Sequence, residues 1–215
     1  MKVYELGKMG SGDWSAAARA LREGGLACLP TDTVYGLACV PGVPEAMDRL
    51  YAAKKRERGK PVALMFSDLR QIRSMLPSLP QILSGMLAAL LPGPVTVILP
   101  ATSEEAAALG SRAGGSIGAR VVPPRFSRQF SHLPLPLALT SANPAGDCEP
   151  CAVYEVPEAI LSRCEFVIDA GRSRIAEPST VVDLRPAAAG GRPLILREGA
   201  MDRRRVENLI EGRGL

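Results

Sequence analysis

The chain of 215 residues is poor in the side chains on which several common mechanisms depend. It has one histidine, so a mechanism built on a histidine general base has a single candidate, His132. Aromatic residues make up 4% of the sequence, which leaves few platforms on which single-stranded bases could stack. The pattern Gly-x-x-x-x-Gly-Lys-Ser/Thr does not occur, so an ATP site of the P-loop kind is excluded. This composition favours catalysis by positioning and charge neutralisation.

Long apolar runs are also missing. The longest stretches, residues 86–91 and 95–99, are too short to cross a bilayer and are bounded by prolines. Residues 1–12 hold lysines and glycines but no apolar segment of the kind found in signal peptides. The five cysteines are odd in number, and 47% of the chain is hydrophobic, so we expect reduced thiols and not a disulfide framework. Together these features predict a cytoplasmic protein with no membrane partner.

Apolar periodicity predicts an α/β fold. Apolar residues at helical spacing follow Asp13, which is the expected N-cap, follow Pro44, and recur within residues 80–91. Short apolar runs predict strands at residues 26–29, 62–66, 95–99, 117–122, 137–140, 166–170, 180–184 and 194–197. Helices alternate with strands early in the chain and strands dominate late, which predicts a mixed sheet flanked by helices.

The length fits one domain followed by a short tail. We expect a catalytic domain over residues 1–200 and a basic tail over residues 201–215, with a last helix at 202–211. Residues 101–115 and 185–193 are rich in small residues, glycine or proline, and both segments are expected to be loops.

The most informative segment is Leu29-Pro30-Thr31-Asp32-Thr33-Val34-Tyr35-Gly36-Leu37. Thr31, Asp32 and Thr33 directly follow a predicted buried strand, and ligands of α/β sheets usually bind at the carboxyl ends of strands. The alternative is a turn in which Asp32 and Thr33 bond their own backbone. The residues alone leave both interpretations open.

A compact cationic cluster follows about twenty residues later, as Lys54-Lys55-Arg56-Glu57-Arg58-Gly59-Lys60-Pro61. Lys54 ends an apolar stripe at helical spacing, where a lysine is unexpected, and Pro61 is expected to stop the helix. A charge run is usually a solvated helix end. However, the net charge of +4 also suits an anionic ligand such as a nucleotide.

Polar residues lie in or at the end of two later predicted strands. Ser116 and Arg120 lie at a predicted strand, where the alternative for Arg120 is a place on an edge strand. Ser141 and Asn143 end another strand, and β alternation directs both to the same side. The alternative there is a strand-to-turn transition in which Asn143 bonds locally. Alone, Ser179 would be an ordinary strand start and Arg197 a surface arginine.

Further blocks complete an ordered set, namely Leu91-Pro92-Gly93-Pro94-Val95-Thr96, Thr140-Ser141-Ala142-Asn143, Ser179-Thr180-Val181-Val182-Asp183 and Leu196-Arg197-Glu198-Gly199. With the two segments above, these blocks resemble the YrdC-like family, the threonylcarbamoyl-AMP synthases, over roughly residues 13–200. The resemblance implies a twisted mixed sheet with a deep cationic cleft. It also implies condensation of L-threonine, bicarbonate or CO2, and ATP into threonylcarbamoyl-AMP and pyrophosphate. A separate tRNA threonylcarbamoyl transferase complex would use the product to modify adenosine 37.

The resemblance also implies a role for individual residues. Lys54 and Arg56 would be catalytic. Contacts to L-threonine would come from Thr33, Met65, Arg120, Ser141 and Ser179. Contacts to ATP would come from Arg56, Lys60, Ser116, Asn143, Cys151 and Arg197. Mg²⁺ would arrive with ATP, since the sequence shows no dedicated carboxylate cage. The chain departs from the family pattern at Pro123, which lies one residue late after Arg120, and at Cys151, where many members carry Thr or Ser.

Other functions remain to be weighed. Gly114-x-Ser116-x-Gly118 matches a nucleophile elbow, but His132 precedes the acidic residues that should come before it. Cys148 and Cys151 form a lone Cys-x-x-Cys pair, which is a weak indication of a metal or redox site. The main alternative is a non-catalytic module that binds tRNA or double-stranded RNA through the same basic cleft and the basic tail. A related carbamoyl-type transferase with another amine acceptor is a further possibility.

Overall fold

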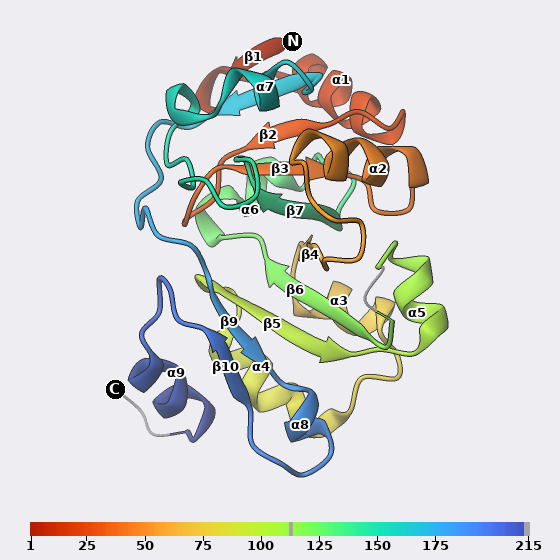
Figure 1. Cartoon of the computed structure of the whole chain (residues 1–215), viewed down its shortest axis with the longest axis vertical. Coiled ribbons are helices and arrows are strands. Elements are labelled where there is room, and N and C mark those ends of the chain that lie inside the picture. The colour runs from red at the N-terminus through yellow and green to blue at the C-terminus, as the bar shows by residue number, and fades with distance from the viewer. Residues whose placement is uncertain (112–113, 213–215) are drawn as a thin grey trace.

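The computed structural model describes residues 1–111 and 114–212 (Figure 1). Its strands are β1 (Lys2–Glu5), β2 (Ala27–Leu29), β3 (Gly36–Cys39), β4 (Ala63–Phe66), β5 (Val95–Pro100), β6 (Ser116–Val121), β7 (Leu137–Ser141), β8 (Phe166–Asp169), β9 (Thr180–Asp183) and β10 (Leu194–Arg197). Within the described residues, these strands form one sheet in the order β1-β8-β2-β3-β7-β4-β6-β5-β9-β10. Parallel pairs such as β4–β6 and β5–β9 alternate with antiparallel pairs such as β3–β7 and β5–β6, so the predicted mixed sheet is confirmed.

Helices cover both faces of the sheet. They are α1 (Ser11–Arg22), α2 (Pro44–Ala53), α3 (Leu69–Met75), α4 (Ser84–Leu90), α5 (Ser103–Ala108), α6 (Pro124–Phe130), α7 (Glu158–Leu161), α8 (Arg185–Ala188) and α9 (Arg203–Ile210), with short 3-10 turns at Leu6–Lys8, Gln81–Leu83 and Val153–Glu155. The smaller core cluster joins α1 and α6 to one face, and the larger cluster joins α2, α4 and α9 to the other. Successive side chains of a strand point to opposite faces of the sheet, so in β2 Cys28 belongs to the larger cluster and its neighbours Ala27 and Leu29 belong to the smaller one.

Helix α1 confirms the predicted apolar face but not the predicted cap. Trp14, Ala17 and Leu21 are buried, as their spacing requires. Asp13 lies in the first turn of the helix, and its carboxylate accepts a hydrogen bond from the backbone N–H of Gly10, the N-cap, at 3.1 Å. The expectation that Asp13 is the N-cap was therefore wrong: the helix begins earlier, and Asp13 satisfies a backbone donor from inside it.

Two other helix predictions need correction. Residues 80–91 divide into a 3-10 turn and α4. The apolar spacing of this segment predicts that Ile82, Leu83, Met86, Leu87 and Leu90 face inward, and Leu83, Leu87 and Leu90 are indeed buried, whereas Ile82 is 62% exposed. Helix α2 ends at Ala53, well before Pro61, so this proline does not stop the helix.

The two predicted loops each contain a short helix. Thr102 and Glu105 form a capping box that begins α5, in which Glu105 N–H donates to Thr102 Oγ1 at 3.1 Å and Thr102 N–H donates to Glu105 Oε2 at 2.8 Å. The Thr-x-x-Glu pattern is visible in the sequence and is the signal that would have predicted α5. In the second segment, the side chain of Asp183 accepts from the backbone N–H of Arg185 at 3.0 Å where α8 begins.

The predicted last helix is confirmed as α9. Its N-cap is Asp202, whose carboxylate accepts from the Arg205 N–H at 2.8 Å, and the helix packs against α4 with Val206 fully buried. The division of the chain at residue 200 stays a prediction. Across the described ranges 1–111 and 114–212, no helix has the length and apolar character required to cross a bilayer.

Candidate active site

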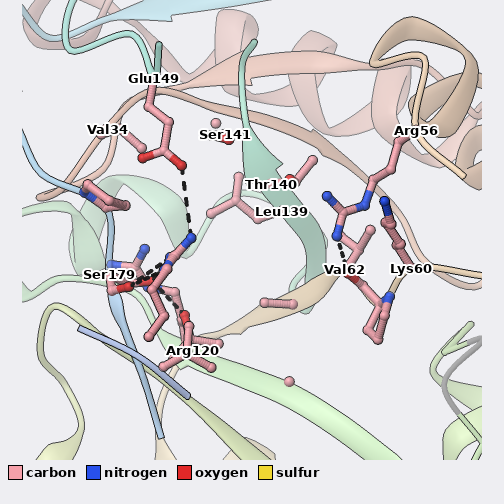
Figure 2. A pocket seen from close by; sticks show the side chains of 18 of the residues that line it. Val34, Arg56, Lys60, Val62, Arg120, Leu139, Thr140, Ser141, Glu149 and Ser179 are labelled. Atoms are coloured by element: carbon pink, nitrogen blue, oxygen red, sulfur yellow. Dashed lines mark hydrogen bonds and ion pairs between the residues drawn. The ribbon is translucent and has the colours of Figure 1, made fainter. Parts of the chain in front are cut away.

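A cavity of about 870 Å³ lies across the middle strands of the sheet, from β3 to β9 (Figure 2). Its walls come from the turn after β2, the loop after α2, strands β5, β6 and β7, and the region around β9 and β10. Most of the site residues expected from the sequence line it, namely Thr33, Lys54, Arg56, Lys60, Ser116, Arg120, Ser141, Asn143, Ser179 and Arg197. Segments far apart in the sequence are thus brought to one cavity.

The turn after β2 is built around Thr31, which is almost fully buried. Its hydroxyl donates to the carbonyl of Val34 at 2.6 Å and accepts from the backbone N–H groups of Thr33 and Val34, each at 3.1 Å. The segment therefore does form a turn held by a side chain that bonds the local backbone, but this side chain is Thr31 and not Asp32 or Thr33, as the turn alternative expected. The side chains of Asp32 and Thr33 are left to bind Arg120.

Thr33 and Asp32 both hold the guanidinium of Arg120. Arg120 donates from Nη1 to Thr33 Oγ1 at 3.1 Å and from Nη2 to Asp32 Oδ1 at 2.9 Å. Burial lowers the pKa of Arg120, and the Asp32 carboxylate opposes that shift. Strand β6 lies between β4 and β5, so the edge-strand alternative for Arg120 is wrong. A buried, fixed guanidinium at a cavity wall suits recognition of a carboxylate.

The hydroxyl of Thr33 lies 2.9 Å from that of Thr31. Thr31 gives its one hydroxyl proton to the carbonyl of Val34, and its two lone pairs face the backbone N–H groups of Thr33 and Val34, so Thr31 is not the donor in this contact. Thr33 Oγ1 accepts from Arg120. The hydroxyl of Thr33 keeps a second lone pair, which suits a substrate donor such as an amine or a hydroxyl.

Lys54 is buried, as its place on the apolar stripe implies, with 2% of its surface exposed. Its ammonium donates to the carbonyls of Ser141 and Asn143, the latter at 2.5 Å, and lies 3.3 Å from Asn143 Oδ1. Burial first, and then Arg56, lower the pKa of Lys54 to about 8, while Glu149 opposes them. These contacts use all three donors of the ammonium, so in this arrangement it fixes the segment that leaves β7.

Arg56 and Lys60 lie on the loop after α2, on the opposite side of the pocket from Ser179 (Figure 2). Arg56 donates from Nη2 to the carbonyl of Pro61 at 2.9 Å, whereas its buried Nε has no partner within residues 1–111 and 114–212. Lys60 lies 3.4 Å from Glu57, an exposed residue of the same loop. The cationic cluster is therefore only partly a solvated helix end, because these two side chains reach the cavity.

Ser179 and Arg197 form the opposite wall. Ser179 Oγ is 2.8 Å from Thr96 Oγ1, and Arg197 donates to the carbonyl of Ser179 from Nη2 at 2.7 Å and from Nε at 3.2 Å. Ser141 and Asn143 line the cavity together, as strand alternation predicted. Asn143 also donates from Nδ2 to the carbonyl of Asp147 at 2.7 Å, so the local bond of the turn alternative is present as well.

Two expected residues lie outside the cavity lining among the described residues. Met65 is 1% exposed and packs in the smaller core cluster. Cys151 is buried, its N–H donates to Glu155 at 2.7 Å, and its carbonyl accepts from Ser173 N–H at 2.7 Å. Their assigned substrate contacts stay predictions, and both main-chain groups of Cys151 already have partners.

Sequence reasoning missed several lining residues. Thr96 ends one of the segments that carry the family resemblance, but the resemblance gave it no substrate contact, and Arg185 lies in a segment that was predicted to be a loop. Glu149 was seen only as part of the Cys-x-x-Cys pattern. His132 stacks on Trp14, with ring centroids 5.5 Å apart, and within residues 1–111 and 114–212 no group of three His, Cys, Asp or Glu side chains could hold a metal ion.

Known proteins share this fold. The model of the Sua5/YciO/YrdC family, described as telomere recombination, matches residues 19–199. The threonylcarbamoyl-AMP synthase of Pyrococcus abyssi is 29% identical over 195 residues, covering 90% of this chain and 56% of that protein. The synthase of Pseudomonas aeruginosa (strain UCBPP-PA14) is 31% identical over 168 residues, covering 78% of this chain and 90% of that protein.

Solved structures agree. The structure of P. abyssi Sua5 complexed with L-threonine matches with a TM-score of 0.85 and 25% identity over 98% of this chain and 61% of that one. E. coli YciO, at 23% identity, shares the fold with a TM-score of 0.76 over 95% of this chain and 97% of that one. The chain thus spans little more than half the length of the P. abyssi relative, but nearly all of the shorter relatives. The chain belongs to the Sua5/YciO/YrdC family.

Proposed function

We propose that this chain is a threonylcarbamoyl-AMP synthase, a nucleotidyltransferase that condenses L-threonine, bicarbonate or CO2, and ATP and releases pyrophosphate. One observation carries the proposal: a single cavity joins a buried, carboxylate-recognising arginine, Arg120, to the cationic loop of Arg56 and Lys60. The names of the relatives support the same reaction.

The amino acid would bind at the wall formed by Thr33, Arg120 and Ser179. Arg120 would pair with the carboxylate of threonine, because a guanidinium fork matches a carboxylate better than a point charge does. Thr33 would accept a hydrogen bond from the substrate, since one lone pair of its hydroxyl is left after the bond from Arg120. Ser141 and Ser179 would complete the pocket with groups that can donate or accept.

The triphosphate would bind toward Arg56 and Lys60, and Ser116, Asn143 and Arg197 would contact the nucleotide. Attack on the α-phosphate builds negative charge on the non-bridging oxygens and on the departing pyrophosphate, and fixed cations stabilise that charge. Arg56 is well suited because its Nε is a buried donor to which no described residue is bonded. Lys54 would act by holding Asn143 and Ser141 in place.

The reaction would proceed in two steps. The neutral amine of threonine adds to CO2, loses a proton and becomes a carbamate. A carbamate oxygen then attacks the α-phosphorus of ATP, and the bond to the β-phosphate oxygen breaks as pyrophosphate leaves. Mg²⁺ would come with ATP and supply charge neutralisation on the phosphates. The lining offers only scattered carboxylates, Asp147 and Glu149 among the described residues, which fits an ion held mainly by phosphate and water.

The product would pass to a separate tRNA threonylcarbamoyl transferase complex, which would form N6-threonylcarbamoyladenosine at position 37. Both the condensation and the later transfer to tRNA would take place in the cytoplasm, where ATP and tRNA are both present. Direct contact of the chain with tRNA is not needed for the condensation.

The deciding experiment measures pyrophosphate release from ATP and bicarbonate with and without L-threonine, with L-serine as the matched control. We expect release that depends on L-threonine. Folded protein that releases no pyrophosphate would overturn the proposal. If that protein also bound RNA with an affinity that falls steeply with salt, the non-catalytic RNA-binding alternative would take its place.

A further inference from the structure

One carboxylate in the cavity is not explained by the proposed reaction. Glu149 lies on the loop that follows β7, and 25% of its side chain is exposed. Its Oε1 is 4.0 Å from Nη1 of Arg197, and its Oε2 is buried without a hydrogen-bond partner among the described residues. Figure 2 shows this carboxylate pointing across the pocket, away from its own loop and toward the wall that carries Ser179 and Arg120.

Two carboxylates next to the cavity are paired more closely than Glu149. Asp32 is paired with Arg120 at 2.9 Å, and Asp183 binds Arg185 at 2.7 Å. The one ion pair of Glu149 among the described residues is the long contact to Arg197, although its charge also acts on Lys54. A carboxylate oxygen buried without a partner costs free energy, so the chain tolerates a destabilising group where Arg197 is expected to contact the nucleotide.

Arg197 links this charge to the opposite wall. Its Nη2 and Nε donate to the carbonyl of Ser179, and its Nη1 faces Glu149. The guanidinium is thus held from both sides of the cavity, by a carbonyl of one wall and a carboxylate of the other. A phosphate that takes the Nη1 side of Arg197 must displace Glu149 or lie next to its negative charge.

We propose that Glu149 is a positioning residue, an anionic latch that orients Arg197 across the cavity and competes with nucleotide phosphate for its guanidinium. The proposal rests on nucleotide binding in this cavity. The latch sets the affinity for the nucleotide through Arg197, and it needs no contact between Glu149 and the metal ion.

The test is a double-mutant cycle of ATP binding, measured by titration calorimetry on wild type, Glu149→Gln, Arg197→Ala and the double variant, each with Mg²⁺ and with EDTA. Glu149→Gln keeps the shape of the side chain and removes its charge. We expect it to bind ATP about five- to tenfold more tightly under both conditions, and we expect this gain to disappear in the Arg197→Ala background.

Other outcomes overturn the latch. A gain that persists without Arg197 would mean general repulsion of phosphate, and a loss seen only with Mg²⁺ would make Glu149 a ligand of the metal ion. Glu158→Gln, at the exposed start of α7, removes the same charge outside the cavity lining and controls for net charge. Thermal unfolding of each variant controls for folding.

The same titration separates this proposal from the proposed function. If wild type binds ATP and Glu149→Gln binds it equally well, the latch alone is rejected. If neither protein binds ATP or inorganic triphosphate, the nucleotide site is rejected and the latch with it.

Discussion

At the scale of single residues, the two buried cations of the cavity differ in how their charge is compensated. Arg120 faces the Asp32 carboxylate at 2.9 Å, so its charge is neutralised by an ion. Lys54 is surrounded mainly by carbonyl and amide oxygens. Neutral acceptors compensate a buried ammonium less well than a carboxylate does, and this difference makes Lys54 sensitive to pH.

The pKa of Lys54 predicts how stability changes with pH. Its value of about 8 in the folded chain lies below the ordinary 10.5, so between these two pH values the unfolded chain binds the proton more strongly. The contribution of Lys54 to the free energy of unfolding should therefore rise from about pH 8 to about pH 10.5. Urea unfolding of wild type and Lys54→Met across this range measures it as the difference between the two profiles. Parallel profiles would contradict the prediction.

Arg120→Ala should weaken L-threonine more than ATP, because the lost guanidinium is the expected partner of the amino acid's carboxylate. The measurement is KM for each substrate in the pyrophosphate assay. Equal weakening of both substrates would reject the carboxylate assignment. Because the substitution leaves Asp32 without its partner, we also expect a lower melting temperature, and the double variant Asp32→Asn/Arg120→Ala should recover part of that loss.

Arg56→Ala should lower kcat by a factor on the order of 10²–10³ with the fold intact, as expected for the loss of one charge-stabilising donor. Arg58→Ala is the matched control on the same loop, since Arg58 is exposed and faces Asp48 at 3.6 Å. Near-normal turnover of Arg56→Ala, or a loss accounted for by unfolding, would remove Arg56 from the catalytic residues.

At the scale of elements, Thr180 ties β9 to the turn that precedes α9. Its buried hydroxyl donates to the carbonyl of Met201 at 2.5 Å and accepts from the N–H groups of Gly199 at 3.1 Å and Met201 at 3.0 Å. Gly199 is needed there, because an added Cβ would lie 2.3 Å from the carbonyl oxygen of Pro178. The end of β10, and with it Arg197, is placed by this junction.

Thr180→Val should destabilise the chain by about 1–3 kcal/mol, because it leaves buried backbone groups without a partner. Thr180→Ser keeps the hydroxyl and should therefore lower the free energy of unfolding much less than Thr180→Val does. Amide exchange in α9, followed alongside urea unfolding, should show the earliest opening there. If Thr180→Ser, which loses only the methyl group, destabilised the chain more than Thr180→Val, which loses only the hydroxyl, packing of the methyl group and not the hydrogen bonds would hold this junction.

At the scale of the whole molecule, the sequence predicted the α/β class, most strands and most cavity residues, for different reasons. Short apolar runs located β5 and β6, whereas the resemblance assigned Ser179 and Arg197, which alone look ordinary. The order of strands could not be predicted, because pairings such as β5–β9 join segments far apart in the chain. The direction of the Lys54 ammonium could not be predicted either, because it is set by the carbonyls of Ser141 and Asn143, which only folding brings near.

The packing of α9 predicts how the chain responds to loss of its tail. Val206 is fully buried in the larger core cluster, and α9 covers α4, so the helix contributes to the core of the molecule. A chain that ends at Ala200 should therefore lose several kcal/mol of stability, on the order of the cost of exposing two buried apolar side chains.

Val206→Ala isolates the buried contact and should cost about 1–3 kcal/mol. Arg204→Ala, on the exposed side of the same helix, is the matched control and should change stability by less than about 0.5 kcal/mol. Urea unfolding of the three variants gives the comparison. If residues 1–200 alone unfold at the same urea concentration as the full chain, the boundary predicted at residue 200 is correct and α9 is a dispensable tail. If Val206→Ala and the truncation both lower the midpoint while Arg204→Ala does not, the core extends through α9.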